Sequence, residues 1–141
     1  MSPETNIATV RRMIEQVYNK RHIDLIEEFF TEDVILHVIG IPSSSELEAL
    51  RKYISQGLNA FPDFKLTFED EIAAGDKVAA RWTMTGTQKG ELSGIPATDK
   101  QVTESGMSFY RLTNAKIAEI WFLADNLGLM QQLGVIPQGA A

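Results

Sequence analysis

The feature that most constrains the fold is the stretch from Asp63 to Ala124, in which apolar and polar residues alternate with the period of two that strands require. Two turn signals divide it: Gly75-Asp76 lies within residues 64–90, and Asn114-Ala115 lies within residues 100–124. The stretch therefore predicts four strands arranged as two long hairpins. Strands joined by hairpins pair antiparallel and need no crossover helices, so the helices must come from other parts of the chain.

Helical patterns lie on both sides of this stretch. Ser2 and Pro3 have the spacing of an N-cap and a first-turn proline, and Ser45 and Glu48 have the spacing of a capping box. Gly134 stands where a helix commonly ends in a left-handed residue. The pattern predicts helices over residues 3–18, 25–30, 45–61 and 127–133, and a strand over 33–40.

This order of elements predicts an α+β fold in one domain spanning residues 1–141, because the helices must cover one face of an antiparallel sheet. A long sheet that curls around the third helix forms a cone with an internal cavity. Gly86 and Gly106 fall in the middle of strands, where a glycine allows either a bend or the close approach of a neighbouring side chain.

Charge and composition exclude several classes of function. The formal net charge of −6 argues against binding to nucleic acid or to an anionic membrane surface. The chain has no cysteine and two histidines, so we expect no disulfide, no thiolate chemistry and no metal site. Residues 1–20 lack the apolar core of a signal peptide, and a cytoplasmic protein is the expectation. No motif for a phosphate-bearing cofactor is present, and we expect no cofactor.

Asp125 is the first candidate for chemistry, and it has two interpretations. It follows the apolar run Trp121, Phe122 and Leu123, and an acid in such surroundings loses water and gains a raised pKa that suits proton transfer. The alternative is that Asp125 caps the helix after it, since aspartate is a favoured N-cap residue.

His37, near the end of the first strand, could orient a substrate carbonyl or exchange a proton. The alternative is a satisfied, partly buried structural histidine. Large apolar residues could line a cavity for a flat ligand, although the same residues could fill an ordinary core. The candidates for this lining are Phe61, Trp82, Met84, Met107, Phe109 and Trp121.

Several segments resemble the SnoaL-like polyketide cyclases, also called ester cyclase-like proteins, of the NTF2-like superfamily. They are "FTEDVILH" at 30–37, "FPDF" at 61–64, "GDKVAARWTMTGTQKGELSGIPATDKQV" at 75–102 and "KIAEIWFLADNLGLMQQLG" at 116–134. The resemblance implies a cone-shaped α+β barrel, a deep pocket and a homodimer formed through the sheet. It also implies a cofactor-free intramolecular aldol reaction on a small hydrophobic carbonyl compound, with Asp125 as general acid and base.

The chain departs from the family pattern at Gln88, where histidine is frequent, and the strand "ESGMSFYR" offers few polar partners for a substrate. We expect Asp125 to transfer the proton and His37 and Gln88 to orient the substrate. An isomerase or hydrolase that uses the same acid, a non-catalytic carrier of small molecules, and a dimerising interaction module with a filled core are the alternatives.

Overall fold

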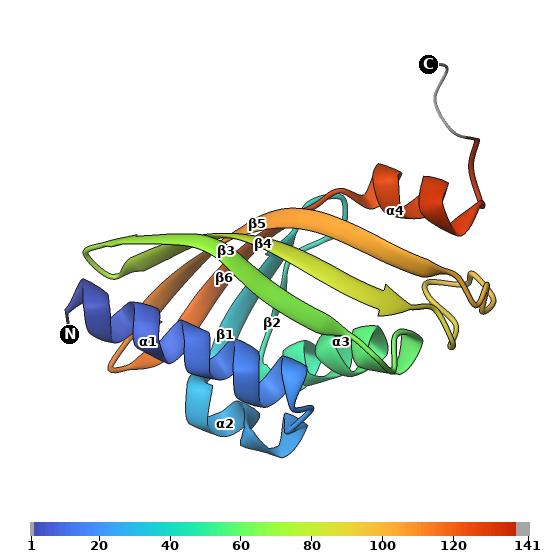
Figure 1. The fold of residues 1–141 in the computed structure, drawn as a ribbon. Helices are drawn as coiled ribbons and strands as arrows, with labels where there is room; N and C mark the ends of the chain where they lie inside the picture. Colours follow the sequence, from blue (N-terminus) through green and yellow to red (C-terminus); the bar gives the residue numbers. More distant parts are fainter. Residues whose placement is uncertain (1, 138–141) are drawn as a thin grey trace.

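The computed structural model describes residues 2–137, which form one curved six-stranded sheet with three helices on its concave side (Figure 1). The helices are α1 (Pro3–Met13), α2 (Ile26–Phe29), α3 (Leu47–Ala60) and α4 (Asn126–Leu133). The strands are β1 (Phe30–Val38), β2 (Ser44–Ser45), β3 (Lys65–Ala74), β4 (Lys77–Thr87), β5 (Gln101–Thr113) and β6 (Lys116–Ala124). Their order in the sheet is β2-β1-β6-β5-β4-β3.

Both predicted hairpins are confirmed. Strand β3 pairs antiparallel with β4, and β5 pairs antiparallel with β6. Asn114 and Ala115 have φ angles of 49° and 65°, so the second turn uses two left-handed residues without a glycine. The sheet is not wholly antiparallel, because β1 lies parallel to β6. The long chain segment between these two strands crosses the concave side through α3, and a parallel pair requires a connection of that kind.

Helix α1 begins as predicted, with the Ser2 side chain accepting a hydrogen bond from the Thr5 N–H at 3.1 Å and proline in the first turn. The helical path continues from Ile14 to Asn19 as a π-helix. Val10, Met13 and Val17 are buried, so this face of the helix packs on the sheet.

Helix α3 begins differently from the prediction. Ser44 and Ser45 form β2 and pair with β1, and no side chain caps the helix at Glu46, whose φ angle is 80°. The capping-box prediction is therefore wrong, because strand pairing with β1 uses the serines before the helix starts. The helix buries Leu50 and Ile54 under the sheet, so the predicted apolar stripe faces the core.

Helix α4 covers a free sheet edge. Strand β6 ends at Ala124 opposite Gly106, so residues 101–105 of β5 have no strand beside them on that side. The Gln132 side chain accepts from the Thr103 N–H and donates to the Thr103 carbonyl, both at 2.8 Å. These bonds satisfy backbone groups of β5 that a neighbouring strand would otherwise pair.

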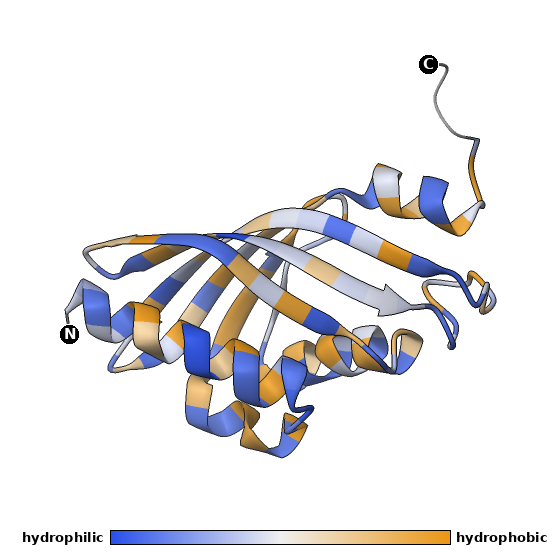
Figure 2. Ribbon diagram, in the orientation of Figure 1, coloured by the Kyte–Doolittle hydropathy of each residue, from blue (hydrophilic) through white to orange (hydrophobic). Residues whose placement is uncertain are grey.

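The core lies between the concave face and α1, the π-helical turn, α2 and α3. Hydrophobic and hydrophilic residues alternate along the strands (Figure 2), which gives the sheet an inner and an outer set of side chains. Trp82 is 2% exposed and covers Gly106, where an added Cβ would collide with the indole ring. The absence of a side chain at Gly106 therefore allows the Trp82 ring to pack closely against β5. Among residues 2–137, no helix has both the length and the apolar character that crossing a membrane needs.

Gly106→Ala should lower the free energy of unfolding by about 1–3 kcal/mol, because the new methyl group overpacks the Trp82 ring. The matched control is Gly57→Ala in α3, where an added Cβ meets nothing within 4 Å and should stabilise the helix by up to ~1 kcal/mol. Urea unfolding measures both changes. Equal stability of Gly106→Ala and wild type would contradict the packing described here.

Candidate functional site

Asp125 links β6 to α4 and caps the helix. Its carboxylate accepts a hydrogen bond from the Gly128 N–H at 2.9 Å, and an added Cβ at Gly128 would collide with that carboxylate. Its own N–H donates to the Ser105 carbonyl at 3.0 Å, which holds the residue beside β5. The capping interpretation is therefore confirmed.

The expected desolvation of Asp125 is wrong. Asp125 is exposed, and its apolar neighbours Leu123 and Leu127 are themselves 54% and 63% exposed. An apolar flank in the sequence does not bury an acid when the flanking side chains also face solvent. Capping alone does not decide whether Asp125 takes part in chemistry, because an exposed carboxylate keeps free lone pairs for a proton.

Glu104 of β5 is the acid that the sheet buries, and the sequence analysis missed it. It is 8% exposed, and its Oε2 atom has no hydrogen-bond partner. Burial, followed by the negative charge of Asp125, raises the pKa of Glu104 above the ordinary glutamate value of 4.5 to about 7. The group therefore changes charge near neutral pH.

The strand pattern carried a signal for Glu104. Alternate residues of β5 share a face, and the face that holds Val102, Tyr110 and Leu112 must be the buried one. Glu104 is two residues after Val102, so it lies on the same buried face. A carboxyl group among buried apolar residues is rare without a partner, and such groups are candidates for function.

Aromatic and apolar side chains surround Glu104. Met84 of β4 is its partner across the strands, and Trp82 lies one pair further along the same face. Trp82 stacks on Phe122 with ring centroids 5.0 Å apart and donates from Nε1 to the Ser108 hydroxyl at 2.9 Å.

Tyr53 of α3 packs edge-on against Phe122, with ring centroids 6.5 Å apart. Burial, followed by the charge of Glu104, raises the pKa of Tyr53, so its hydroxyl keeps its proton near neutral pH. This corner of the inner face therefore holds the Glu104 carboxyl group and the Tyr53 phenol among aromatic rings, and the charge of Asp125 acts on Glu104 from the exposed end of β6.

Four predicted site residues lie on the outer face of the sheet instead. Met107 and Phe109 are 57% and 53% exposed, and Trp121 pairs across the strands with both Phe109 and His37. The expectation that these side chains line an interior pocket is therefore wrong. They occupy the alternate positions to Ser108, Tyr110 and Phe122, and the period of two places them on the opposite face.

His37 belongs to a hydrogen-bonded group on that outer face. Nδ1 lies 2.7 Å from the Ser43 hydroxyl, Nε2 lies 2.7 Å from the Glu119 carboxylate, and the ring stacks on Trp121. Glu119 also accepts from Arg111 Nε at 3.0 Å, and the hydrogen bond from His37 contributes most to lowering the pKa of Glu119. His37 therefore belongs to the outer face of the sheet and does not line the inner face.

Gln88 and Phe61 have structural environments. Gln88 is fully buried, and its amide donates to the carbonyls of Gly90 and Ile95 and accepts from both the N–H and the hydroxyl of Thr98. These four bonds hold the loop between β4 and β5 in place. They occupy the amide N–H and carbonyl groups of Gln88 that would otherwise bind a substrate. Phe61 is 3% exposed and packs against Gly86, so it too belongs to the core.

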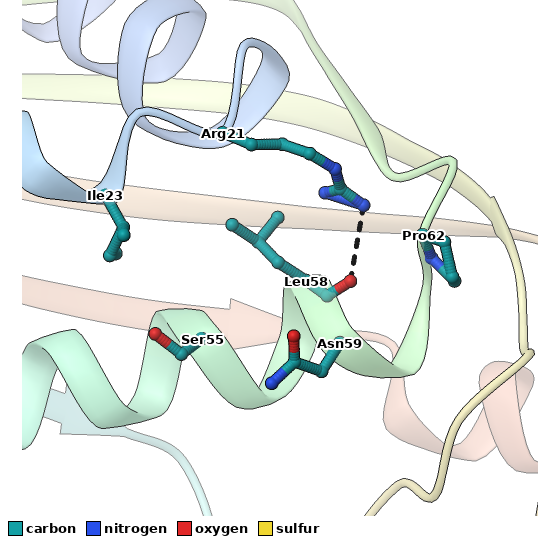
Figure 3. Close-up of a pocket in the computed structure, with 6 residues that line it drawn as sticks. All are labelled: Arg21, Ile23, Ser55, Leu58, Asn59 and Pro62. Carbon is teal, nitrogen blue, oxygen red and sulfur yellow. Dashed lines mark hydrogen bonds between the residues drawn. The ribbon is translucent and has the colours of Figure 1, made fainter.

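A hollow of about 340 Å³ lies between the segment that follows the π-helix, at Arg21 and Ile23, and the C-terminal part of α3 (Figure 3). Its lining residues are Arg21, Ile23, Ser55, Leu58, Asn59 and Pro62. Arg21 reaches across to donate to the carbonyls of Leu58 and Phe61, which caps the end of α3. A second hollow of about 290 Å³ lies beside the turns at Gly75 and Asn114. Neither hollow is lined by Glu104 or Asp125.

Comparison with known proteins decides the family. A family model described as SnoaL-like polyketide cyclase matches residues 8–133. The chain belongs to the SnoaL-like polyketide cyclase family. Aklanonic acid methyl ester cyclase DauD from Streptomyces sp. (strain C5) is 29% identical over 142 residues, which cover 95% of this chain and 83% of the cyclase.

Solved structures of other bacterial proteins share the fold. AclR from Streptomyces galilaeus, described as a candidate hydroxylase, has a TM-score of 0.87 at 25% identity, covering 99% of this chain and 87% of AclR. A candidate SnoaL-like polyketide cyclase from Jannaschia sp. CCS1 has a TM-score of 0.89 at 20% identity, covering 97% of this chain and 98% of the other. The names of these relatives indicate more than one reaction on this fold.

Glu104→Gln should change the dependence of stability on pH. The folded protein holds the Glu104 proton more tightly than the unfolded chain, so this group lowers the free energy of unfolding as pH rises from about 4.5 to about 7. The shift corresponds to ~3 kcal/mol, and glutamine cannot ionise. The free energy of unfolding of Glu104→Gln minus that of wild type should therefore be larger at pH 8 than at pH 4.5, by up to that amount.

Urea unfolding of wild type and Glu104→Gln at the two pH values measures this difference. Glu32→Gln makes the same chemical change at an exposed position of β1 and serves as the control. An identical stability difference between Glu104→Gln and wild type at pH 4.5 and pH 8 would show that Glu104 is not held neutral.

Proposed function

We propose that this SnoaL-like protein is a cyclase-type enzyme that closes a ring in a small, hydrophobic, carbonyl-bearing molecule by an intramolecular aldol reaction. Carboxyl groups of the protein supply the acid and base catalysis, and no cofactor takes part. The observation that carries the proposal is the position of Asp125 in a chain of this family: its carboxylate is exposed at the end of β6 and is held there by the Ser105 carbonyl and the Gly128 N–H.

An aldol ring closure requires mainly proton transfer and positioning of the substrate from the protein. A carbon between two carbonyl groups is already acidic, so a carboxylate can remove its proton. The protein must then hold the chain folded, protonate the oxygen of the attacked carbonyl and limit access of water. The aromatic corner formed by Tyr53, Trp82 and Phe122 is suited to a flat, apolar chain of this kind.

The substrate must enter at the end of the sheet where β1 and β6 finish. The N–H of Ile39, just beyond β1, donates to the Phe122 carbonyl, and Asp125 follows β6 directly. Ile39, Ile41 and Leu127 are 65%, 53% and 63% exposed at this end, and they provide apolar surface for the ligand. Because Tyr53 and Phe122 fill the inner face there, we expect side chains of α3 or α4 to move when substrate binds.

The same acid pair could serve an isomerase or a hydrolase, since both reactions also use acid and base groups. The relative DauD, an aklanonic acid methyl ester cyclase, favours ring closure. A carrier or an interaction module would not need Glu104, whose ionisation in the folded protein is costly. Replacement of such a carboxyl by an uncharged residue removes that cost, so its presence favours a role in chemistry.

Asp125→Asn tests the proposed activity. Asparagine caps a helix as well as aspartate, so the fold and α4 should remain, while ring closure should fall by about 10²–10⁴-fold through loss of proton transfer. Aklanonic acid methyl ester and smaller aromatic polyketide esters are the probes. Ring closure leaves the mass unchanged, so chromatographic retention and ultraviolet absorbance identify the product.

Asp33→Asn, at an exposed position of β1, is the matched control and should retain full activity. Turnover by Asp125→Asn at the wild-type rate would remove Asp125 from the mechanism. Absence of ring closure by wild type on every ester tried would contradict the proposed function.

We further propose that the enzyme is a homodimer formed through the outer face of the sheet. One row of cross-strand neighbours runs over five strands of that face and is largely apolar. Its members are His37, Trp121, Phe109, Ala79 and Ile72. Charged residues border this row, among them Lys77, Arg81, Arg111 and Glu119. Arg111 and Glu119 already pair with each other, so a second copy could cover that part of the row at a reduced desolvation cost.

Phe109→Lys should dissociate this dimer, because it places a charge at the centre of the apolar row. Ile41→Lys, at a residue that is also 53% exposed but lies in the loop after β1, is the control and should remain dimeric. Sedimentation velocity at micromolar concentration gives the oligomeric state. A monomeric wild type would contradict the homodimer.

A further inference from the structure

The two carboxyl groups of the site have opposite surroundings. Asp125 is exposed, and its position is fixed by its backbone bond to Ser105 and by its cap bond to Gly128. Glu104, which precedes Ser105 in β5, is 8% exposed and faces the core. The backbone bond places Asp125 next to the residue that follows Glu104 in β5, and the negative charge of Asp125 acts on Glu104 from there.

One oxygen of the buried acid, Glu104 Oε2, has no hydrogen-bond partner among residues 2–137. Met84, its neighbour on β4, carries no charge, and the ionisable groups whose charges interact with Glu104 are Asp125 and Tyr53. No cation is among them to hold Glu104 ionised, and an ionised Asp125 opposes a second negative charge.

We propose that Glu104 and Asp125 divide the proton transfers of the ring closure, with Glu104 as the acid and Asp125 as the base. This inference rests on the proposed function. Two neighbouring carboxyl groups in different environments settle into one neutral and one ionised member, and that difference assigns the acid and the base. Glu104 is the member kept neutral by burial.

The step balances without a co-reactant. The Asp125 carboxylate takes the proton from the carbon between two carbonyl groups, and the electron pair of that C–H bond forms an enolate. The enolate carbon bonds to the carbon of the second carbonyl, whose π electrons move to its oxygen. The Glu104 carboxyl donates its proton to that oxygen, which gives an alcohol.

After the step, Asp125 is neutral and Glu104 is ionised. The raised pKa of Glu104 favours its reprotonation, and transfer of the proton from Asp125 to Glu104 restores the starting state. Because Asp125 is exposed, water can also exchange its proton. Tyr53 keeps its proton throughout and can donate a hydrogen bond to a substrate carbonyl beside Glu104.

The pH dependence of ring closure tests this division. In wild type, kcat/KM should decline on the alkaline side with a midpoint near 7, as Glu104 loses its proton. Glu104→Gln, which keeps the shape of the side chain, should lower kcat by about 10²–10⁴-fold and remove that decline. Circular dichroism and urea unfolding verify that the variant is folded.

Carboxyl-carbon NMR of the protein with labelled glutamate gives a readout that needs no substrate. Glu104 should titrate near 7 in wild type and at a lower pH in Asp125→Asn, where the neighbouring charge is absent. Titration of Glu104 in the ordinary glutamate range, or wild-type turnover by Glu104→Gln, would overturn the division while leaving the cyclase proposal intact. Failure of wild type to close any ring would overturn both.

Discussion

The site depends on one electrostatic constraint: a carboxyl group on the buried face of the sheet lies beside another carboxyl group that faces solvent. Glu104 cannot ionise easily where it is, because it has lost water and because Asp125 already carries negative charge. The same two causes make it a proton donor near neutral pH. The exposed partner keeps free lone pairs that can accept a proton, and this contrast is the basis of the acid and base roles that we propose for the two residues.

The scaffold explains why the two acids stay together. Strand β6 stops at Ala124, and the chain turns into α4, which binds the edge of β5 through Gln132 and Thr103. Asp125 stands at this turn and is held by the N–H of Gly128 and the carbonyl of Ser105. Its role as a helix cap and its position beside Glu104 therefore have the same origin, and the capping bond contributes to the precision of the site.

Much of the fold could be predicted from local pattern. The hairpins, the Ser2 cap and the capped ends of α4 follow from turn residues and periodicity. The parallel pairing of β1 with β6 and the strand at Ser44 and Ser45 could not, since they depend on contacts between distant segments. The predicted pocket lining was wrong where residues were chosen by their apolar character and the alternation of side chains between the two faces of the sheet was not counted. Met107 and Phe109 lie on the outer face, whereas Glu104, in the same strand, lies on the inner face.

The most direct measurement of the central claim is neutron diffraction from crystals of the wild-type protein grown in D₂O near pH 6. At that pH, below the Glu104 pKa of about 7, we predict a deuteron on the Glu104 carboxyl. A deuteron on Asp125 together with an ionised Glu104 would contradict the assignment of the buried group as the acid.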